Sequence, residues 1–102
     1  HMERSGSWPY LGSIPAHRLF CVQLSDVPAG DGAGQAPLDR LTPGQGRIDW
    51  RVLFRFLDKS AYPGLVSFEA PNPDTWSLDA ASVARAGLSG IDKLWQDSRS
   101  DF

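Results

Sequence analysis

The chain has 102 residues, one cysteine and a formal net charge of −2. This length suffices for one small domain, and the charge excludes the basic surface with which proteins bind nucleic acids or acidic membranes. No apolar run approaches the roughly 18 residues of a membrane-spanning helix, and a lone cysteine excludes an internal disulfide, so a cytoplasmic location is expected.

Residues 1–18 show no regular pattern. His1 and Met2 look like a cloning remnant, and glycines and prolines interrupt any helix or strand in residues 3–18. We expect 3–18 to be a loop that enters a domain spanning residues 19–95, and 96–102 to be a frayed tail.

Residues 19–25 are predicted to form a β-strand because large and small side chains alternate. The side chains on one face are smaller and more polar, and they include Cys21 and Gln23. Gln23 lies near the carboxyl end of the strand, and we expect Cys21 to be inert. A parallel strand is covered on both sides, so this face needs another cover, such as a barrel interior with a polar site at its mouth. The bulky face, expected under a helix, holds Phe20, Val22 and Leu24.

A long loop, residues 26–45, follows this strand and is rich in glycine and proline. Loops beyond about 12–15 residues are usually functional or disordered, and a position after the carboxyl end of a strand favours function; Asp26 is expected to be a loop or cap residue. Asp49 is a suitable N-cap for a helix over residues 50–59. Its apolar stripe holds Trp50, Leu53, Phe54 and Leu57.

A tight turn at residues 62–64 leads to a second predicted strand, residues 65–69, with the same parity as the first. Val66 and Phe68 face one way, and the opposite face ends in Glu69. Since ligands bind at the carboxyl ends of parallel strands, we expect Gln23 and Glu69 to point the same way from neighbouring strands.

The last predicted helix, residues 80–95, has an apolar stripe of Ala81, Ala84, Leu88, Ile91 and Trp95. Gly87 and Gly90 each cost up to about 1 kcal/mol relative to alanine inside a helix, so this helix is expected to depend on close packing. The order of elements is two consecutive βα units, an α/β pattern.

Three motifs, VQLSD, RLTPGQGRIDW and AYPGLVSFEAPNP, resemble the C-terminal end of the xylose-isomerase-like TIM-barrel superfamily. This superfamily includes sugar and sugar-phosphate isomerases and epimerases, inosose dehydratase, 3-dehydroshikimate dehydratase and endonuclease IV. The resemblance covers roughly residues 4–94 and implies the C-terminal βαβα part of an eight-stranded barrel of about 250 residues. The barrel is then incomplete, and we expect self-association or a chain that supplies the missing strands.

The resemblance also implies a divalent metal held by a Glu, an Asp, a His or Gln, and a final Glu. Gln23 matches the third ligand and Glu69 the fourth, with Glu69 also acting as the catalytic proton carrier, while the first two ligands have no counterpart. An all-oxygen set favours Mn²⁺ or Mg²⁺, with Co²⁺ as a further option. Arg40 matches an arginine that reaches the substrate, and Asn72 and Trp76 could line the same mouth.

Each assignment has a plainer alternative. Without the resemblance Gln23 is an ordinary strand glutamine, Glu69 a solvated loop carboxylate and Arg40 a solvent-exposed arginine, and Trp76 suits a core position equally. The favoured function is the C-terminal part of a metal-dependent sugar (phosphate) isomerase or epimerase that abstracts a proton next to a carbonyl. The alternatives are a dehydroshikimate or inosose dehydratase-like lyase and a non-catalytic remnant used in assembly or binding. In each enzyme the substrate is a sugar or sugar-like polyol.

Overall fold

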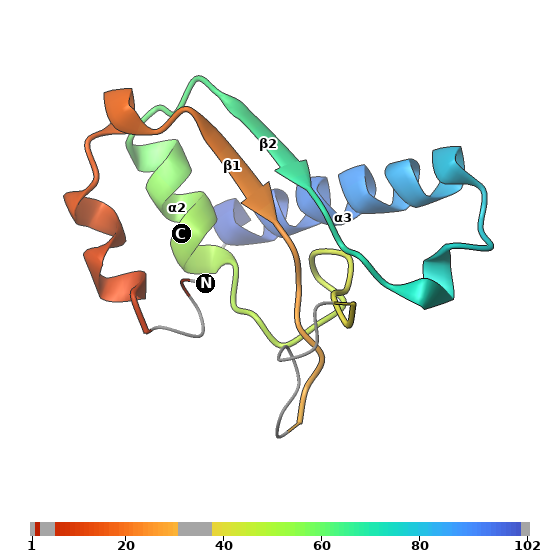
Figure 1. The fold of residues 1–102 in the computed structure, drawn as a ribbon. Helices are drawn as coiled ribbons and strands as arrows, with labels where there is room; N and C mark the ends of the chain where they lie inside the picture. Colours follow the sequence, from red (N-terminus) through yellow and green to blue (C-terminus); the bar gives the residue numbers. More distant parts are fainter. Residues whose placement is uncertain (1, 3–5, 31–37, 101–102) are drawn as a thin grey trace.

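The computed structural model describes residues 2, 6–30 and 38–100. Two parallel strands lie side by side, and two α-helices pack against one side of them (Figure 1). Short 3₁₀ turns η1, η2 and η3 precede the first strand and follow the second. The elements in chain order are η1 (Trp8–Ser13), η2 (Ala16–Arg18), β1 (Cys21–Leu24), α2 (Arg51–Lys59), β2 (Leu65–Phe68), η3 (Pro73–Thr75) and α3 (Ala80–Ser100).

The predicted pair of βα units is therefore confirmed, with shifts at the ends of elements. The segment before β1 was expected to be irregular but contains η1 and η2, and α3 runs to Ser100 where a frayed tail was expected from residue 96. Among the described helices, none is long and apolar enough to cross a membrane.

β1 and β2 pair in parallel, with Gln23 opposite Ser67 and Leu24 opposite Phe68. The backbone ladder continues one step beyond the strands, because the Glu69 amide donates to the Leu24 carbonyl at 3.0 Å. This register carries the chain in one direction through both strands, so their carboxyl ends lie together.

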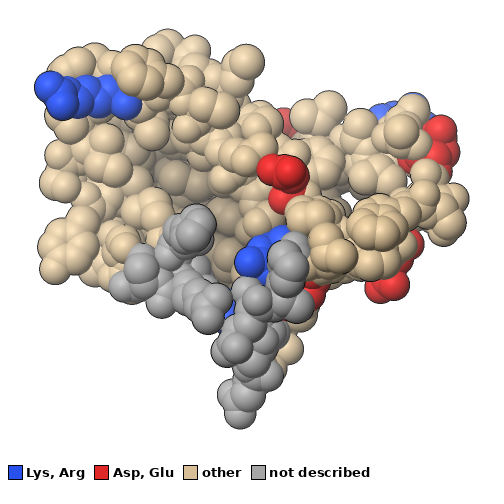
Figure 2. Space-filling view, in the orientation of Figure 1, with Lys and Arg blue, Asp and Glu red and all other residues tan. Residues whose placement is uncertain are grey.

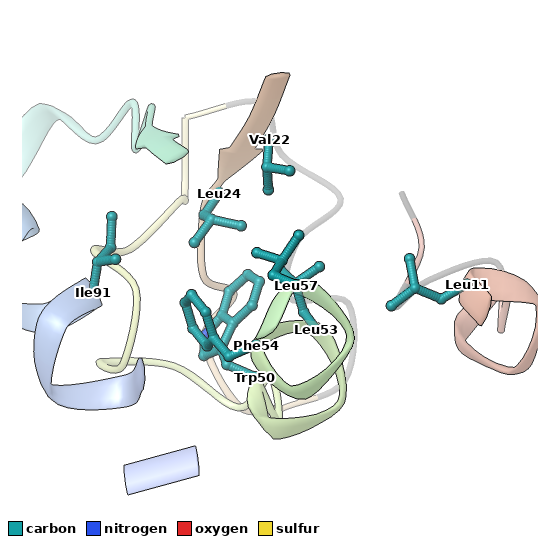
Figure 3. Close-up of a cluster of buried hydrophobic side chains, with 8 residues drawn as sticks. All are labelled: Leu11, Val22, Leu24, Trp50, Leu53, Phe54, Leu57 and Ile91. Atoms are coloured by element: carbon teal, nitrogen blue, oxygen red, sulfur yellow. The ribbon is translucent and has the colours of Figure 1, made fainter. Parts of the chain in front are cut away.

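The core lies between the strands and α2 (Figure 3). The predicted stripe of α2 is buried as expected, and Phe54 is fully enclosed. From β1 only Val22 and Leu24 reach this core; Phe20, predicted to share their environment, is 84% exposed. Strand pairing begins after Phe20, at Cys21, so Phe20 lies outside the paired part of the strand. The buried hydrophobic residues are Leu11, Val22, Leu24, Trp50, Leu53, Phe54, Leu57 and Ile91.

α2 ends in a Schellman motif. The Tyr62 amide donates to the Leu57 carbonyl at 3.0 Å and the Ala61 amide to the Asp58 carbonyl at 3.1 Å, the two bonds that define this cap. Ala61 has φ 53°, in the left-handed region that glycine adopts without strain. The turn then places β2 beside β1, with the Tyr62 hydroxyl donating to the Leu65 carbonyl at 2.7 Å.

α3 packs through its glycines, as the sequence predicted, and two members of the predicted stripe face the core: Ile91 is buried and Trp95 packs against it. A Cβ on Gly87 would collide with the ring of Phe68, and one on Gly90 would lie 2.7 Å from the Pro43 carbonyl oxygen. These close approaches fix the buried side of the helix. The predicted stripe is therefore wrong at Leu88, which is 57% exposed, and at Ala81 and Ala84, which are also exposed.

Candidate functional site

The two strand-end residues Gln23 and Glu69 come from adjacent parallel strands. Gln23 is exposed between the buried Val22 and Leu24, so its side chain lies on the face away from α2. Glu69 is also exposed and follows Phe68, which is partly buried. Because side chains alternate along extended backbone and Gln23 pairs with Ser67, Gln23 and Glu69 belong to the same face of the sheet.

Asp26, the next residue but one after β1, is fully buried. Its Oδ1 accepts from the amides of Val27 at 2.9 Å and Ile48 at 3.1 Å. Its Oδ2 accepts from the Gly44 amide at 2.8 Å and from Nε1 of Trp50 at 3.0 Å. Four N–H donors thus satisfy a carboxylate that would otherwise be costly to bury.

This carboxylate clasp, formed by Asp26 with the loop of residues 41–48, explains why the loop contains glycine at two positions. Gly44 has φ 96°, a conformation that L-residues rarely adopt. A Cβ on Gly46 would lie well inside 3.0 Å of both Asp26 Oδ1 and the Val27 carbonyl oxygen. Sequence reasoning treated Asp26 as an ordinary loop or cap residue. The signal it did not use is an aspartate at a strand end followed by a glycine-rich loop, whose bare amides can surround a carboxylate.

Arg40 lies between the two strand ends. Its amide donates to the Pro71 carbonyl at 3.2 Å, and its carbonyl accepts from Nδ2 of Asn72 at 3.2 Å. Next to it, Leu41 and Asp26 exchange two backbone hydrogen bonds of 2.8 and 2.9 Å. The Arg40 guanidinium pairs with the Asp39 carboxylate, and both side chains are about a quarter exposed.

The residues after β2 have observed structural roles. Asn72 caps η3, since its Oδ1 accepts from the Asp74 amide at 3.0 Å, while its amide group holds Arg40. Trp76 is 66% exposed, so it is not a core residue beneath the last helix. The structure therefore gathers Gln23, Glu69, Arg40 and Asn72 at the ends of the strands and leaves Trp76 on the surface beyond η3.

The oxygen donors at this edge fit part of a cation site. The Gln23 amide and the Glu69 carboxylate are the ligand types that hard divalent cations take. Within residues 2, 6–30 and 38–100, no group of three His, Cys, Asp or Glu side chains could hold a metal ion.

A cavity of about 320 Å³ lies between β1, α2 and the segment before β1, and Gln23 is one of its lining residues. Its lining is mostly apolar, and it includes neither Glu69 nor Arg40. Figure 2 shows few charged side chains over the strands on this face of the molecule. The cavity adjoins the edge of β1 that no described strand pairs with. Its lining residues include Trp8, Leu11, Cys21, Gln23, Trp50 and Leu53.

The carboxylates with clearly shifted pKa values are Asp49, just before α2, and Asp58, within α2. A hydrogen bond from Arg51 lowers the pKa of Asp49 from 3.8 to about 2. Hydrogen bonds from Arg99 and then from Trp95 lower the pKa of Asp58. The Arg99–Asp58 ion pair, at 2.8 Å, ties α3 to α2, and the Trp95 ring packs 5.1 Å from the Phe54 ring, centroid to centroid. These groups stabilise the helix pair.

Comparison with known proteins agrees with this architecture. A search of curated proteins found no match. A solved structure described as the IolI protein with a bound zinc atom superimposes with a TM-score of 0.76 at 20% sequence identity. That match covers 89% of this chain and 33% of the IolI chain, so this chain spans about a third of the length of that structure. The sequence matches the profile of the xylose isomerase-like TIM barrel over residues 1–94, and the chain belongs to that family.

Proposed function

We propose that this chain supplies the last two βα units of a divalent-metal-dependent isomerase or epimerase that acts on a sugar or sugar phosphate. The observation that supports it is the parallel register of β1 and β2, which puts Gln23 and Glu69 on one face at the carboxyl ends of adjacent strands. The family assignment adds weight, because active sites of TIM barrels lie at this end.

In the proposed reaction Glu69 removes a proton from the carbon next to the substrate carbonyl. In an isomerase the proton returns to the former carbonyl carbon, and in an epimerase a proton returns to the opposite face of the same carbon. Gln23 and Glu69 would hold a divalent cation, which when bound would polarise that carbonyl oxygen. The zinc atom bound by IolI supports a divalent cation in this fold, and the oxygen donors suit Mn²⁺ or Mg²⁺. Arg40 and Asn72 would orient the substrate.

Two strands cannot enclose such a site. The outer edge of β1 pairs with no strand among the described residues. On the face of β1 away from α2, Cys21 and Gln23 are exposed. Unpaired strand edges recruit other strands. We therefore propose that the site is completed by further barrel strands, contributed by more of the same polypeptide, by a second copy or by another chain.

A second candidate is a dehydratase of the 3-dehydroshikimate or inosose type. Glutamine at position 23 favours it. Many epimerases carry histidine at the matching position, and the glutamine is more similar to the dehydroshikimate dehydratases. Proton abstraction next to a carbonyl is common to both reactions, but the dehydratase then expels a hydroxyl group as water. From 3-dehydroshikimate this loss of water gives an aromatic product that is visible by its ultraviolet absorbance.

The experiment is a metal titration followed by a substrate screen. Mn²⁺ would be titrated into this chain and into a complete barrel that contains it, and the barrel would then be assayed with keto-sugars and with 3-dehydroshikimate. Stoichiometric Mn²⁺ binding with sugar turnover supports the isomerase, and turnover of 3-dehydroshikimate supports the dehydratase. Absence of both binding and turnover would mean a non-catalytic role in assembly.

A further inference from the structure

The carboxylate clasp at Asp26 has a consequence for Arg40. A chain of hydrogen bonds joins the buried Asp26 carboxylate to the loop at Gly44 and Ile48, and the Asp26 backbone to Leu41. The residue before Leu41 is Arg40. On the β1 side, the Asp26 main chain therefore holds Leu41, next to this arginine, and the Asp26 carboxylate holds the loop that follows it at Gly44 and Ile48.

A second attachment fixes Arg40 from the β2 side. Its amide and its carbonyl are both occupied, by the Pro71 carbonyl and by the Asn72 side chain. Arg40 is thus held by both of its neighbouring strand ends, although it lies in a long glycine- and proline-rich loop. Asp39 also pairs with its guanidinium.

We propose that Asp26 and Asn72 are positioning residues that hold Arg40 in place for binding an anionic group of the substrate, a role that rests on the proposed function. Neither residue needs to touch the substrate for this. A backbone fixed in advance leaves only the arginine side chain to be ordered on binding, which improves binding by preorganisation. Asn72, predicted from the sequence as a substrate contact, acts in this proposal through the Arg40 carbonyl.

The first arm of the test measures hydrogen exchange in the chain itself. Asp26→Asn keeps the shape of the side chain but puts an N–H group where amide and indole N–H groups point, so it breaks part of the clasp. Amides of residues 38–48 should then exchange about tenfold faster or more, the factor expected for losing one hydrogen bond to a charged group. Amides of α3 should keep their rates, and Asp92→Asn, an exposed change on α3, should change neither segment.

The second arm is a double-mutant cycle in an active complete barrel that contains this segment, with the substrate identified in the screen above. Asp26→Asn and Asn72→Ala should each raise KM much more than they lower kcat, by up to about 100-fold for a displacement of about 1 Å. In an Arg40→Ala background neither change should have a further effect on kcat/KM, because the arginine that they position is gone.

The outcomes separate the two proposals. Unchanged exchange in residues 38–48 of Asp26→Asn, or losses that add fully to that of Arg40→Ala, would overturn the positioning role. If Asp26→Asn does not fold, Asn72→Ala tests the attachment on the β2 side: it removes the side-chain bond to the Arg40 carbonyl and the cap of η3, and leaves the bond from the Arg40 amide to Pro71. Unchanged exchange at residues 38–48, or a loss that adds fully to that of Arg40→Ala, would then overturn the positioning role. If no substrate is turned over, the proposed function fails, and the exchange rates still decide whether Asp26 holds the Arg40 loop.

Discussion

Replacing Gly46 by alanine should test how tightly the Asp26 carboxylate is enclosed. The new methyl group would lie too close to both Asp26 Oδ1 and the Val27 carbonyl oxygen. One of these contacts involves main chain, which cannot rotate away as the end of a long side chain can. We expect the loop to move outward and to break bonds that converge there.

The size of the loss follows from those bonds. Asp26 Oδ1 accepts from the amides of Val27 and Ile48, and the Val27 carbonyl accepts from the Arg47 amide at 2.9 Å. A hydrogen bond to a charged group contributes about 1.5–3 kcal/mol and a neutral one about 0.5–1.5 kcal/mol. Alanine returns about 0.4–1 kcal/mol by restricting the unfolded chain. Losing one bond of each kind therefore lowers the free energy of unfolding by about 1–4 kcal/mol.

Thermal unfolding followed by circular dichroism, at fixed protein concentration, measures this. A loss near 2.5 kcal/mol should lower Tm by about 10 °C or more for a domain of this size. Gly12→Ala is the matched control, because a Cβ there meets nothing within 4 Å, and it should stay within about 0.5 kcal/mol. Equal Tm values for the two variants would refute the tight enclosure of Asp26.

Three further outcomes are expected. Ala61→Gly should raise the free energy of unfolding by about 0.5–1 kcal/mol in urea titrations, because the left-handed φ of 53° strains alanine; a loss of stability would contradict the cap geometry. The hydrogen bond from Arg99 lowers the pKa of Asp58, so the ionised carboxylate stabilises the fold fully above pH 3.8, and this stabilisation is lost as the pH falls below that value. Asp58→Asn should therefore lower Tm at pH 7 and flatten the change in Tm between pH 4 and 2. Parallel curves of Tm against pH for the two proteins would disprove this. In a complete active barrel, Glu69→Gln should lower kcat by about 10²–10⁴-fold and lose the bound metal, whereas Arg40→Ala should mainly raise KM and keep the metal. Steady-state kinetics and elemental analysis of both variants measure these effects. If Glu69→Gln kept its full metal content and turnover, Glu69 would be a solvated carboxylate.

The elements that the sequence predicts well are those whose side chains differ strongly between faces. The stripe of α2 alternates large apolar and charged residues, and its members Leu53, Phe54 and Leu57 are all buried. α3 is rich in alanine, serine and glycine, which distinguish its faces weakly, and the prediction chose Leu88 as buried. Its orientation is decided by the close approach of Phe68 to Gly87, a tertiary contact that no local pattern encodes.

The same distinction applies to the site. The shared parity of the strands predicts that Gln23 and Glu69 lie on one face, since that depends only on strand direction and alternation. The clasp at Asp26 was not predicted, because its donors at Gly44, Ile48 and Trp50 are distant in sequence and mostly main chain. Buried charges are satisfied by whatever the fold brings to them, and residue type alone does not reveal the donors.

The cavity beside β1 is lined by two tryptophans, whose intrinsic fluorescence can report on what fills it. Trp8 and Trp50 both line it, and it adjoins the edge of β1 that pairs with no described strand. Indole emission depends on the polarity around the ring, and water would leave this space if a neighbouring strand and its side chains filled it. The arrival of a completing strand could therefore be followed by intrinsic fluorescence alone, without attaching a dye to Cys21 or to any other residue.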